Sequence, residues 1–168
     1  MKTDRMSWDE YGLSLAKSAA QRADCTRRQV GAALMAGDHS IISMGYNGGP
    51  SKGPSCLGGE CPRGRLTHDQ LPADSAYDTG GGTCVALHAE WNVLIRTAWA
   101  QFEGATLYIT EEPCHICKVM IAGTKIKRVV APDYEWYPKG KPKCKKVTTM
   151  TFGQPCNRPF DHKGDCWP

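Results

Sequence analysis

The alternation of apolar and polar positions predicts a chain of short helices and strands. A capping box of Ser7 and Glu10 precedes apolar residues at helical spacing, which predicts a helix over 7–23. Small and β-branched residues over 29–36, a Gly-Asp turn, and apolar alternation over 40–46 predict a β-hairpin. The chain is therefore expected to begin with a helix followed by two antiparallel strands.

Helical and strand patterns alternate in the second half of the chain. Strands are expected over 105–110 and 126–131, and between them a helix over 114–122 that ends at Gly123. This alternation indicates the α/β class, with helices covering a mixed sheet. A longer helix is expected before these elements, over 85–100, with one face formed by Leu87, Trp91, Leu94, Ile95 and Ala98.

Two segments lack such periodicity. Residues 47–83 are rich in Gly and Pro, and a loop of that length in a compact domain needs something to hold it, such as a metal ion. The tail from Pro132 onward is rich in Pro, Lys and Cys, and only 146–152 has a strand pattern. We therefore divide the chain into a domain over 1–135, with 47–83 as a metal-tied insertion, and a C-terminal extension over 136–168.

Length and charge narrow the classes of function. The 168 residues suit one domain, and the net charge of +4 is spread along the chain without a block of five or six basic residues. A dedicated nucleic-acid binder usually has such a block or a basic stripe. We therefore expect a phosphorylated small molecule as the partner rather than nucleic acid.

No export or membrane segment is expected. Lys2 and Arg5 are followed by acidic Asp9 and Glu10 where a signal peptide needs an apolar stretch, and no run approaches the ~18 apolar residues of a membrane span. The expected location is cytoplasmic, where thiols stay reduced, and nine cysteines cannot all pair. The cysteines are instead expected to bind metal.

Two short motifs carry candidate chemistry. The first contains His88 and Glu90, and the second is a proline followed by Cys114 and Cys117. Because the two cysteines lie three apart at a helix start, their sulfurs share a face where the helix dipole favours thiolates. Alone, this pair suits a structural zinc half-site or a redox pair equally. Together with His88, the two cysteines supply three zinc ligands and leave the fourth position of the metal open for water. Glu90 then provides a nearby carboxylate that can move protons.

This pattern is typical of zinc-dependent nucleobase deaminases. The chain resembles the cytidine and deoxycytidylate deaminase superfamily in both motifs and in their order, over about residues 7–135. The zinc motif is shared by cytidine, guanine, tRNA-adenosine and riboflavin-pathway deaminases, whereas the Gly-Tyr-Asn-Gly of residues 45–48 is typical of the dCMP branch. The matching segments are Cys25–Ala32, Gly45–Pro50, Leu87–Asn92, Gly104–Cys117 and Lys125–Val130.

The resemblance implies a fold and a reaction. The fold would be a three-layer α/β/α cytidine-deaminase-like sandwich with a mixed central sheet and a Cys-rich irregular tail. The reaction would be hydrolytic deamination of dCMP to dUMP, which supplies thymidylate synthesis, with Glu90 as the catalytic acid and base. The zinc ligands would be His88, Cys114 and Cys117.

The resemblance also implies contacts for the nucleotide. Asn47 would bond a sugar hydroxyl, although an ordinary Asn-Gly turn is the alternative. Tyr134 would close over the base. Control by dCTP with Mg²⁺ as activator and dTTP as inhibitor is expected in a homo-oligomer, with a hexamer favoured, through Gly45, Tyr46, Asn47 and Gly48. The cationic candidates for the phosphate are Arg22, Arg27, Arg28 and Lys52.

The remaining cysteines predict further zinc. Cys25 and Cys56 occupy the positions that hold a structural zinc in some relatives. Cys61 and Cys84 would complete a closed set of four, or His68 would replace one of them. Buried free thiols are the alternative. In the tail, a third zinc would be held by Cys144, Cys156, His162 and Cys166; the alternative is a loosely docked tail.

Other functions fit less of the chain. The same chemistry would serve another cytosine nucleotide, such as dCTP or a modified dCMP, or a base within a nucleic acid. A zinc-stabilised binding module without catalysis would leave Glu90 without a role. The sequence therefore favours an enzyme that acts on a small nucleotide.

Overall fold

The computed structural model describes residues 4–72, 75 and 83–140. The chain divides into two compact units, Met1–Pro138 and Lys139–Pro168, and the helices and strands of the described residues all lie in the first unit. The strand predicted over 146–152 lies outside the described residues, as does the third zinc set of Cys144, Cys156, His162 and Cys166.

A five-stranded mixed sheet forms the centre of the first unit. Its strand order is β2-β1-β3-β4-β5; β3 and β4 run parallel, and the other neighbours are antiparallel. The predicted hairpin is confirmed, because β1 and β2 are antiparallel neighbours. The strands are β1 (Gly31–Met35), β2 (Ile41–Tyr46), β3 (Thr106–Ile109), β4 (Arg128–Ala131) and β5 (Tyr134–Trp136).

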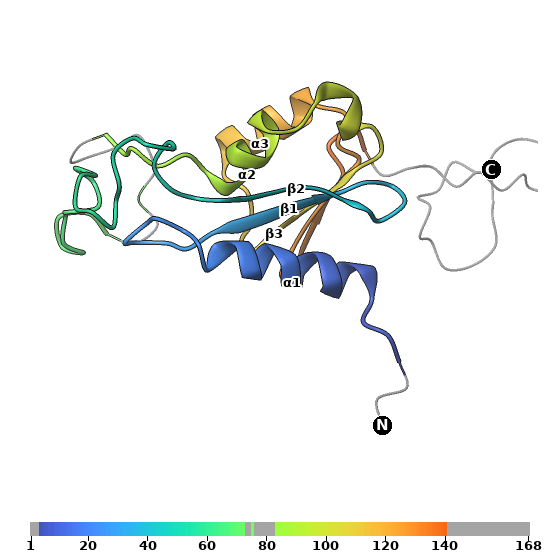
Figure 1. Cartoon of the computed structure of the whole chain (residues 1–168), viewed down its shortest axis with the longest axis horizontal. Coiled ribbons are helices and arrows are strands. Elements are labelled where there is room, and N and C mark those ends of the chain that lie inside the picture. Colours follow the sequence, from blue (N-terminus) through green and yellow to red (C-terminus); the bar gives the residue numbers. More distant parts are fainter. Residues whose placement is uncertain (1–3, 73–74, 76–82, 141–168) are drawn as a thin grey trace, which may run out of the picture. The chain divides into compact units, whose positions relative to one another are not determined.

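Helices cover both faces of this sheet, so the expected three-layer α/β/α arrangement is confirmed. In Figure 1, α1 (Trp8–Ala20) lies below the sheet, and α2 (Ala89–Ile95) and α3 (His115–Gly123) lie above it. The predicted capping box starts α1: the Glu10 N–H donates to Ser7 Oγ at 3.2 Å, and the Ser7 N–H donates to Glu10 Oε2 at 2.7 Å. No helix among the described residues is long and apolar enough to cross a bilayer.

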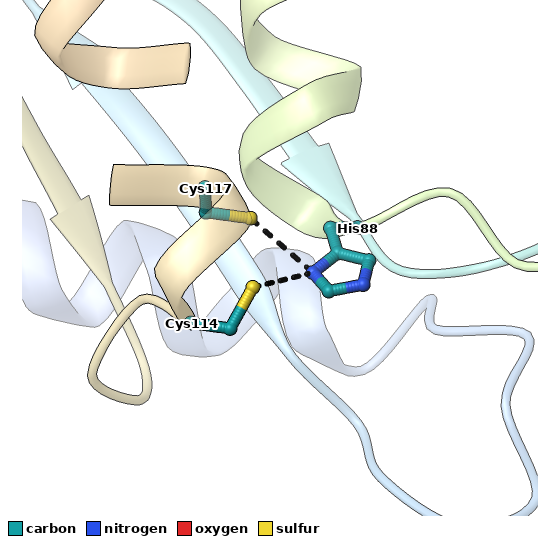
Figure 2. Close-up of side chains that lie close together, drawn as sticks. All are labelled: His88, Cys114 and Cys117. Atoms are coloured by element: carbon teal, nitrogen blue, oxygen red, sulfur yellow. Dashed lines mark hydrogen bonds between the residues drawn. The ribbon is translucent and has the colours of Figure 1, made fainter. Parts of the chain in front are cut away.

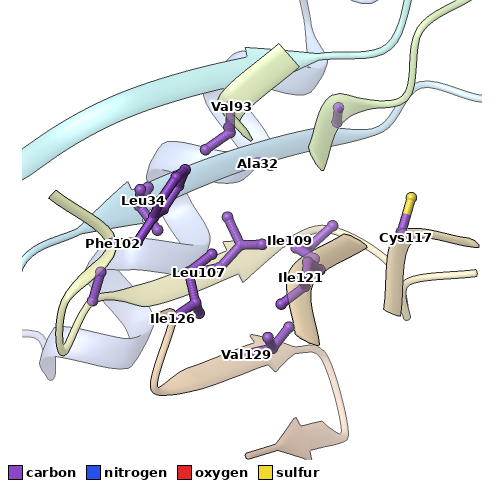
Figure 3. Packing of buried hydrophobic residues seen from close by; sticks show 12 residues of the cluster. Ala32, Leu34, Val93, Phe102, Leu107, Ile109, Cys117, Ile121, Ile126 and Val129 are labelled. Carbon is purple, nitrogen blue, oxygen red and sulfur yellow. The ribbon is translucent and has the colours of Figure 1, made fainter. Parts of the chain in front are cut away.

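Two apolar clusters join the layers. One lies between the sheet and α1 and includes Ala16, Met35 and Tyr108. The larger one lies under α2 and α3 and includes Leu34, Val93 and the other side chains of Figure 3. Every residue of β1 is buried, because its alternate side chains face opposite clusters. This interior strand is thus covered on both faces of the sheet, as in most α/β proteins.

A polar network fastens α1 to the sheet. Arg128 on β4 donates to both carboxylate oxygens of Asp9 at 2.7 Å, and the Tyr108 hydroxyl donates to the same carboxylate at 3.0 Å. Arg128 holds the pKa of the Asp9 carboxyl below its usual value, although partial burial acts in the opposite direction. Burial and the Asp9 carboxylate raise the pKa of Tyr108 to about 12.

The helix predicted over 85–100 is wrong at both ends. Leu87 pairs with Gly48 through two backbone hydrogen bonds of 2.8 and 3.1 Å, so the chain is extended until α2 begins. Beyond α2, a separate 3-10 helix, η1, spans Trp99–Phe102. The expected apolar face is confirmed in part: Trp91 and Leu94 pack against the core, whereas Ile95 is 66% exposed and Val93, which was not predicted, is fully buried.

Two further boundaries differ from expectation. The first helix ends at Ala20 rather than at residue 23, and turn hydrogen bonds follow it. The strand β5 lies in the segment expected to contain no strand before residue 146. It forms because Asp133 adopts a positive φ of 56° and reverses the chain, so that Tyr134 pairs with Ala131. Three residues are too few to show a strand period in sequence.

Candidate active site

Two helix N-termini bring the three predicted zinc ligands together. His88 is the N-cap of α2, Cys114 is the N-cap of α3, and Cys117 lies in the first turn of α3. Figure 2 shows the imidazole facing both sulfurs: Nδ1 lies 3.7 Å from Cys114 Sγ and 3.3 Å from Cys117 Sγ. All three donor atoms lie within 4.8 Å of one another.

These donors fit a tetrahedral zinc ion. Zn–S and Zn–N bonds of about 2.3 and 2.0 Å at a tetrahedral angle separate sulfur and nitrogen by roughly 3.6 Å. Both observed separations lie close to that value. Burial raises the pKa of the Cys117 thiol well above its usual range, and the neighbouring Glu90 and Cys114 raise it further. A bound cation would reverse this effect and stabilise the thiolate.

Glu90 lies beside this set, in the first turn of α2. Its side chain is almost wholly buried, with 4% exposed. Burial raises the pKa of its carboxyl, while contacts with its own backbone N–H and with Cys117 act in the opposite direction. A carboxyl whose pKa is raised toward neutrality can both accept and return a proton.

His88, Cys114 and Glu90 line a cavity of about 310 Å³. That volume is at the lower end of small-molecule sites. Its catalytic wall comes from the starts of α2 and α3, including His88, Glu90 and Cys114. The segment before β1 and the irregular insertion also line it, with residues that include Arg27, Arg63 and His68. A molecule bound in this cavity can therefore contact both the candidate zinc ligand His88 and the insertion.

The Gly-Tyr-Asn-Gly segment joins the hairpin to the catalytic helix. Asn47 is 6% exposed; its Oδ1 accepts from the Val30 N–H at 2.8 Å, and its Nδ2 donates to the Arg28 carbonyl at 2.9 Å. Asn92 on α2 donates to the Tyr46 carbonyl at 2.8 Å. Asn47 lines the cavity. Its contact with a sugar hydroxyl and the allosteric role of residues 45–48 stay predictions.

Of the residues predicted to contact the phosphate or the base, some line the catalytic cavity and others do not. Arg27 and Arg28 line the catalytic cavity. Arg22 lines a separate hollow beside Tyr46 and Pro50, and Lys52 is exposed. Tyr134 lies on β5, where the Lys118 ammonium is 5.2 Å from its ring centre. Neither Arg22 nor Tyr134 is among the described residues that line the catalytic cavity, and their roles stay predictions.

The four cysteines of the predicted structural site all line the cavity. Cys61 Sγ lies 4.0 Å from Cys84 Sγ, and the Thr26 backbone N–H donates to Cys56 Sγ at 3.4 Å. The Arg27 and Arg28 N–H groups lie 3.5 Å from Cys25 Sγ. The group is more open than the catalytic one, because in the described part of the chain only the His88 set has three donors within 4.8 Å. A zinc ion there stays a prediction.

Sequence analysis did not single out two residues near these cysteines, Asp24 and Arg63. The Asp24 carboxylate accepts from the Ser55 hydroxyl at 2.8 Å and from the Cys56 N–H at 3.0 Å, so it positions one cysteine. Burial acts to raise the pKa of Asp24, but these hydrogen bonds hold it below its usual value. Its place directly before Cys25 was the available clue. Nothing local marks Arg63, the other missed residue, since it lies in a segment without periodicity.

The layers, the paired helix N-termini and the donor set are those of a zinc-binding deaminase domain. The chain belongs to the cytidine and deoxycytidylate deaminase zinc-binding family, whose model matches residues 6–132.

Among its relatives, the deoxycytidylate deaminase of Mycobacterium phage D29 is 45% identical over 76% of this chain and 96% of its own length. The Schizosaccharomyces pombe deoxycytidylate deaminase is 38% identical, over 75% of this chain but only 37% of its own length. The dCMP deaminase of cyanophage S-TIM5, solved in complex with dCMP and dUMP, has 28% identity and a TM-score of 0.54. That match covers 76% of this chain and 83% of the phage protein.

Proposed function

We propose that this chain catalyses the hydrolytic, zinc-dependent deamination of dCMP to dUMP, the step that supplies thymidylate synthesis. The observation that carries the proposal is the buried Glu90 carboxyl, which contacts Cys117 and shares a cavity with His88 and Cys114. Relatives that bear the name deoxycytidylate deaminase, and the S-TIM5 complex with dCMP and dUMP, support the choice of substrate.

The residues divide the chemistry between them. His88, Cys114 and Cys117 would hold a zinc ion, which would supply a polarised water molecule of lowered pKa. Glu90 accepts a proton from the attacking water as the water oxygen adds to C4 of cytosine, and delivers the proton to N3. Glu90 then takes the proton of the hydroxyl now on C4 and passes it to the exocyclic amine. The C4–N bond breaks with its electron pair on nitrogen, so ammonia leaves and a carbonyl remains at C4.

Two of the residues predicted to contact the substrate, Asn47 and Arg27, line the catalytic cavity. Asn47 has a second amide proton and a second lone pair beyond those bound to the backbone, so it can still bond a sugar hydroxyl. Arg27 brings a guanidinium to the same cavity for the phosphate. Arg22 and Tyr134 rest on the family resemblance alone.

A structural zinc held by Cys25, Cys56, Cys61 and Cys84 is part of the proposal. Backbone N–H groups directed at three of the four sulfurs support it, because such bonds stabilise thiolates. Purified protein is expected to contain at least two zinc ions per chain, and Cys25→Ser to lose one of them. One zinc per chain, unchanged in Cys25→Ser, would contradict this site.

Regulation and assembly complete the proposal. We expect dCTP with Mg²⁺ to activate and dTTP to inhibit a cytoplasmic homo-oligomer, with a hexamer favoured. Gly48 pairs with Leu87, the neighbour of the zinc ligand His88. This pairing supports the idea that an effector bound at residues 45–48 changes the geometry of the catalytic site. Sedimentation and turnover measured with and without each nucleotide test both points.

A substrate panel tests the reaction itself. Ammonia release is followed with dCMP, dCTP, deoxycytidine and CMP, each with and without dCTP and dTTP. The expected result is the highest kcat/KM for dCMP. A higher kcat/KM for any other member would overturn the assignment, and salt-sensitive binding of single-stranded DNA would favour a nucleic-acid substrate instead.

A further inference from the structure

An indole ring stacks on the candidate zinc ligand His88. Trp91 follows His88 by three residues at the start of α2, a spacing that places both side chains on one face of the helix. The centroids of the two rings lie 4.6 Å apart, and the ring planes differ by 14°. This separation lies within the range of favourable aromatic pairs. One face of the imidazole is therefore covered by the indole.

Apolar packing holds this indole in place. Trp91 is partly buried against the larger core cluster. Its Nε1 atom is buried, and none of the described residues accepts a hydrogen bond from it. A buried indole N–H usually has an acceptor, because leaving the group unsatisfied costs stability. A phenylalanine would avoid that cost, so core packing alone does not explain a tryptophan at this position.

The helix that carries both rings is fastened to the sheet. Val93 on α2 is fully buried, and Asn92 Nδ2 donates to the Tyr46 carbonyl oxygen at the end of β2 at 2.8 Å. The Asn92 N–H donates to the His88 carbonyl oxygen at 3.1 Å. Because the two residues that follow Trp91 are anchored in this way, the indole keeps a fixed position relative to His88.

The stack sets the plane of the imidazole. Rotation of the His88 ring about its Cβ–Cγ bond would break the contact, so the indole leaves the ring two orientations that differ by a half-turn. Only one of them directs Nδ1 toward Cys114 and Cys117, at 3.7 and 3.3 Å (Figure 2). An imidazole bound to a cation is also attracted more strongly to the electron-rich face of an indole. The stack therefore favours the metal-loaded site.

We propose that Trp91 is a positioning residue of the zinc site: its indole holds the His88 imidazole in the plane that metal binding requires, and so raises the affinity of the site for zinc. This inference rests on the zinc ion of the proposed function. Trp91 is not among the described residues that line the catalytic cavity, so it acts through His88 and not on the substrate.

Substitutions at Trp91 separate stacking from packing. Trp91→Leu and Trp91→Met keep an apolar side chain but remove the aromatic face, and each is expected to weaken metal binding at the His88 site by about 3- to 10-fold, the range that one aromatic pair contributes. Either variant suffices if the other does not fold. Trp91→Phe keeps an aromatic face and should bind metal within about twofold of the wild type. The matched control is Trp99→Leu on η1, where the ring is 58% exposed and metal binding should be unchanged.

Titration with Co²⁺ measures this affinity without turnover. Cobalt-loaded His88→Ala protein serves as the blank, so that the difference in visible absorption belongs to the His88 site. The absorption bands depend on ligand geometry and should change in the two non-aromatic variants, but not in Trp91→Phe or Trp99→Leu. The melting temperature of each metal-free protein checks its folding.

Two outcomes would overturn the inference. One is wild-type affinity and absorption in a folded non-aromatic variant, which would show that the stack does not act on the metal site. The other is a loss in Trp91→Phe as large as in Trp91→Leu, which would point to packing volume instead. Wild-type protein whose metal binding depends on Trp91 but which releases no ammonia from dCMP would instead refute the proposed reaction.

Discussion

Gly45 couples the sheet to the catalytic helix through close packing. It is a buried residue of β2, and a Cβ there would lie 2.4 Å from the Ala89 carbonyl oxygen and 3.0 Å from the Val93 nitrogen. Both contacts are with the backbone of α2, which cannot rotate away. We therefore expect Gly45→Ala to push α2 off the sheet.

The expected size of this effect follows from the contact distances. Restoring an ordinary separation of 3.4 Å from 2.4 Å requires a displacement of about 1 Å. Overpacking of this kind costs about 1–3 kcal/mol, or a fall in melting temperature of about 2–12 °C. Ala89 lies between His88 and Glu90, so both catalytic side chains move with it. A misplacement of about 1 Å can lower turnover by roughly 10²-fold.

Thermal melting, zinc content and ammonia release from dCMP measure the three consequences. The matched control is Gly37→Ala in the hairpin turn, where the nearest atom to a Cβ is the Gly104 carbonyl oxygen at 3.9 Å. This control should melt and turn over like the wild type. If Gly45→Ala does the same, close packing of β2 against α2 does not position the catalytic residues.

Three other substitutions test the site and the fold. Glu90→Gln should keep its zinc and its fold, yet lower turnover of dCMP by at least about 10²-fold, and retained turnover would refute its proton-transfer role. Asp9→Asn tests the link to Arg128: because folding lowers the Asp9 pKa, its stabilisation is present above the unfolded pKa of about 3.9 and is lost as pH falls through the lower folded value. Melting at pH 7 should therefore show a loss of at most about 1 kcal/mol, since the pair is partly exposed, and this loss should shrink as the pH falls below about 3.9. A loss that does not shrink as the pH falls would point to packing instead. Ile121→Ala should cost about 2–5 kcal/mol in denaturant unfolding, whereas Ile116→Ala, 40% exposed on the same helix, should cost under about 0.5 kcal/mol; equal losses would contradict the assigned core.

Local patterns predicted the elements whose hydrogen bonds are local. The Ser7 capping box, the hairpin and the short helix after Cys114 follow from neighbours a few residues apart. The helix over 85–100 failed for the opposite reason. Its start was decided by the pairing of Leu87 with Gly48, which no local pattern encodes.

The sequence by itself determined the reaction class, because zinc chemistry needs particular donors at particular spacings. His88, Glu90, Cys114 and Cys117 were recognisable without coordinates, and two helix N-termini bring the three ligands together. Only the tertiary structure decided which other residues line the cavity with them. The placement of Arg63 in the wall depends on contacts between segments far apart in the chain, and such contacts leave no periodic trace in a Gly- and Pro-rich insertion.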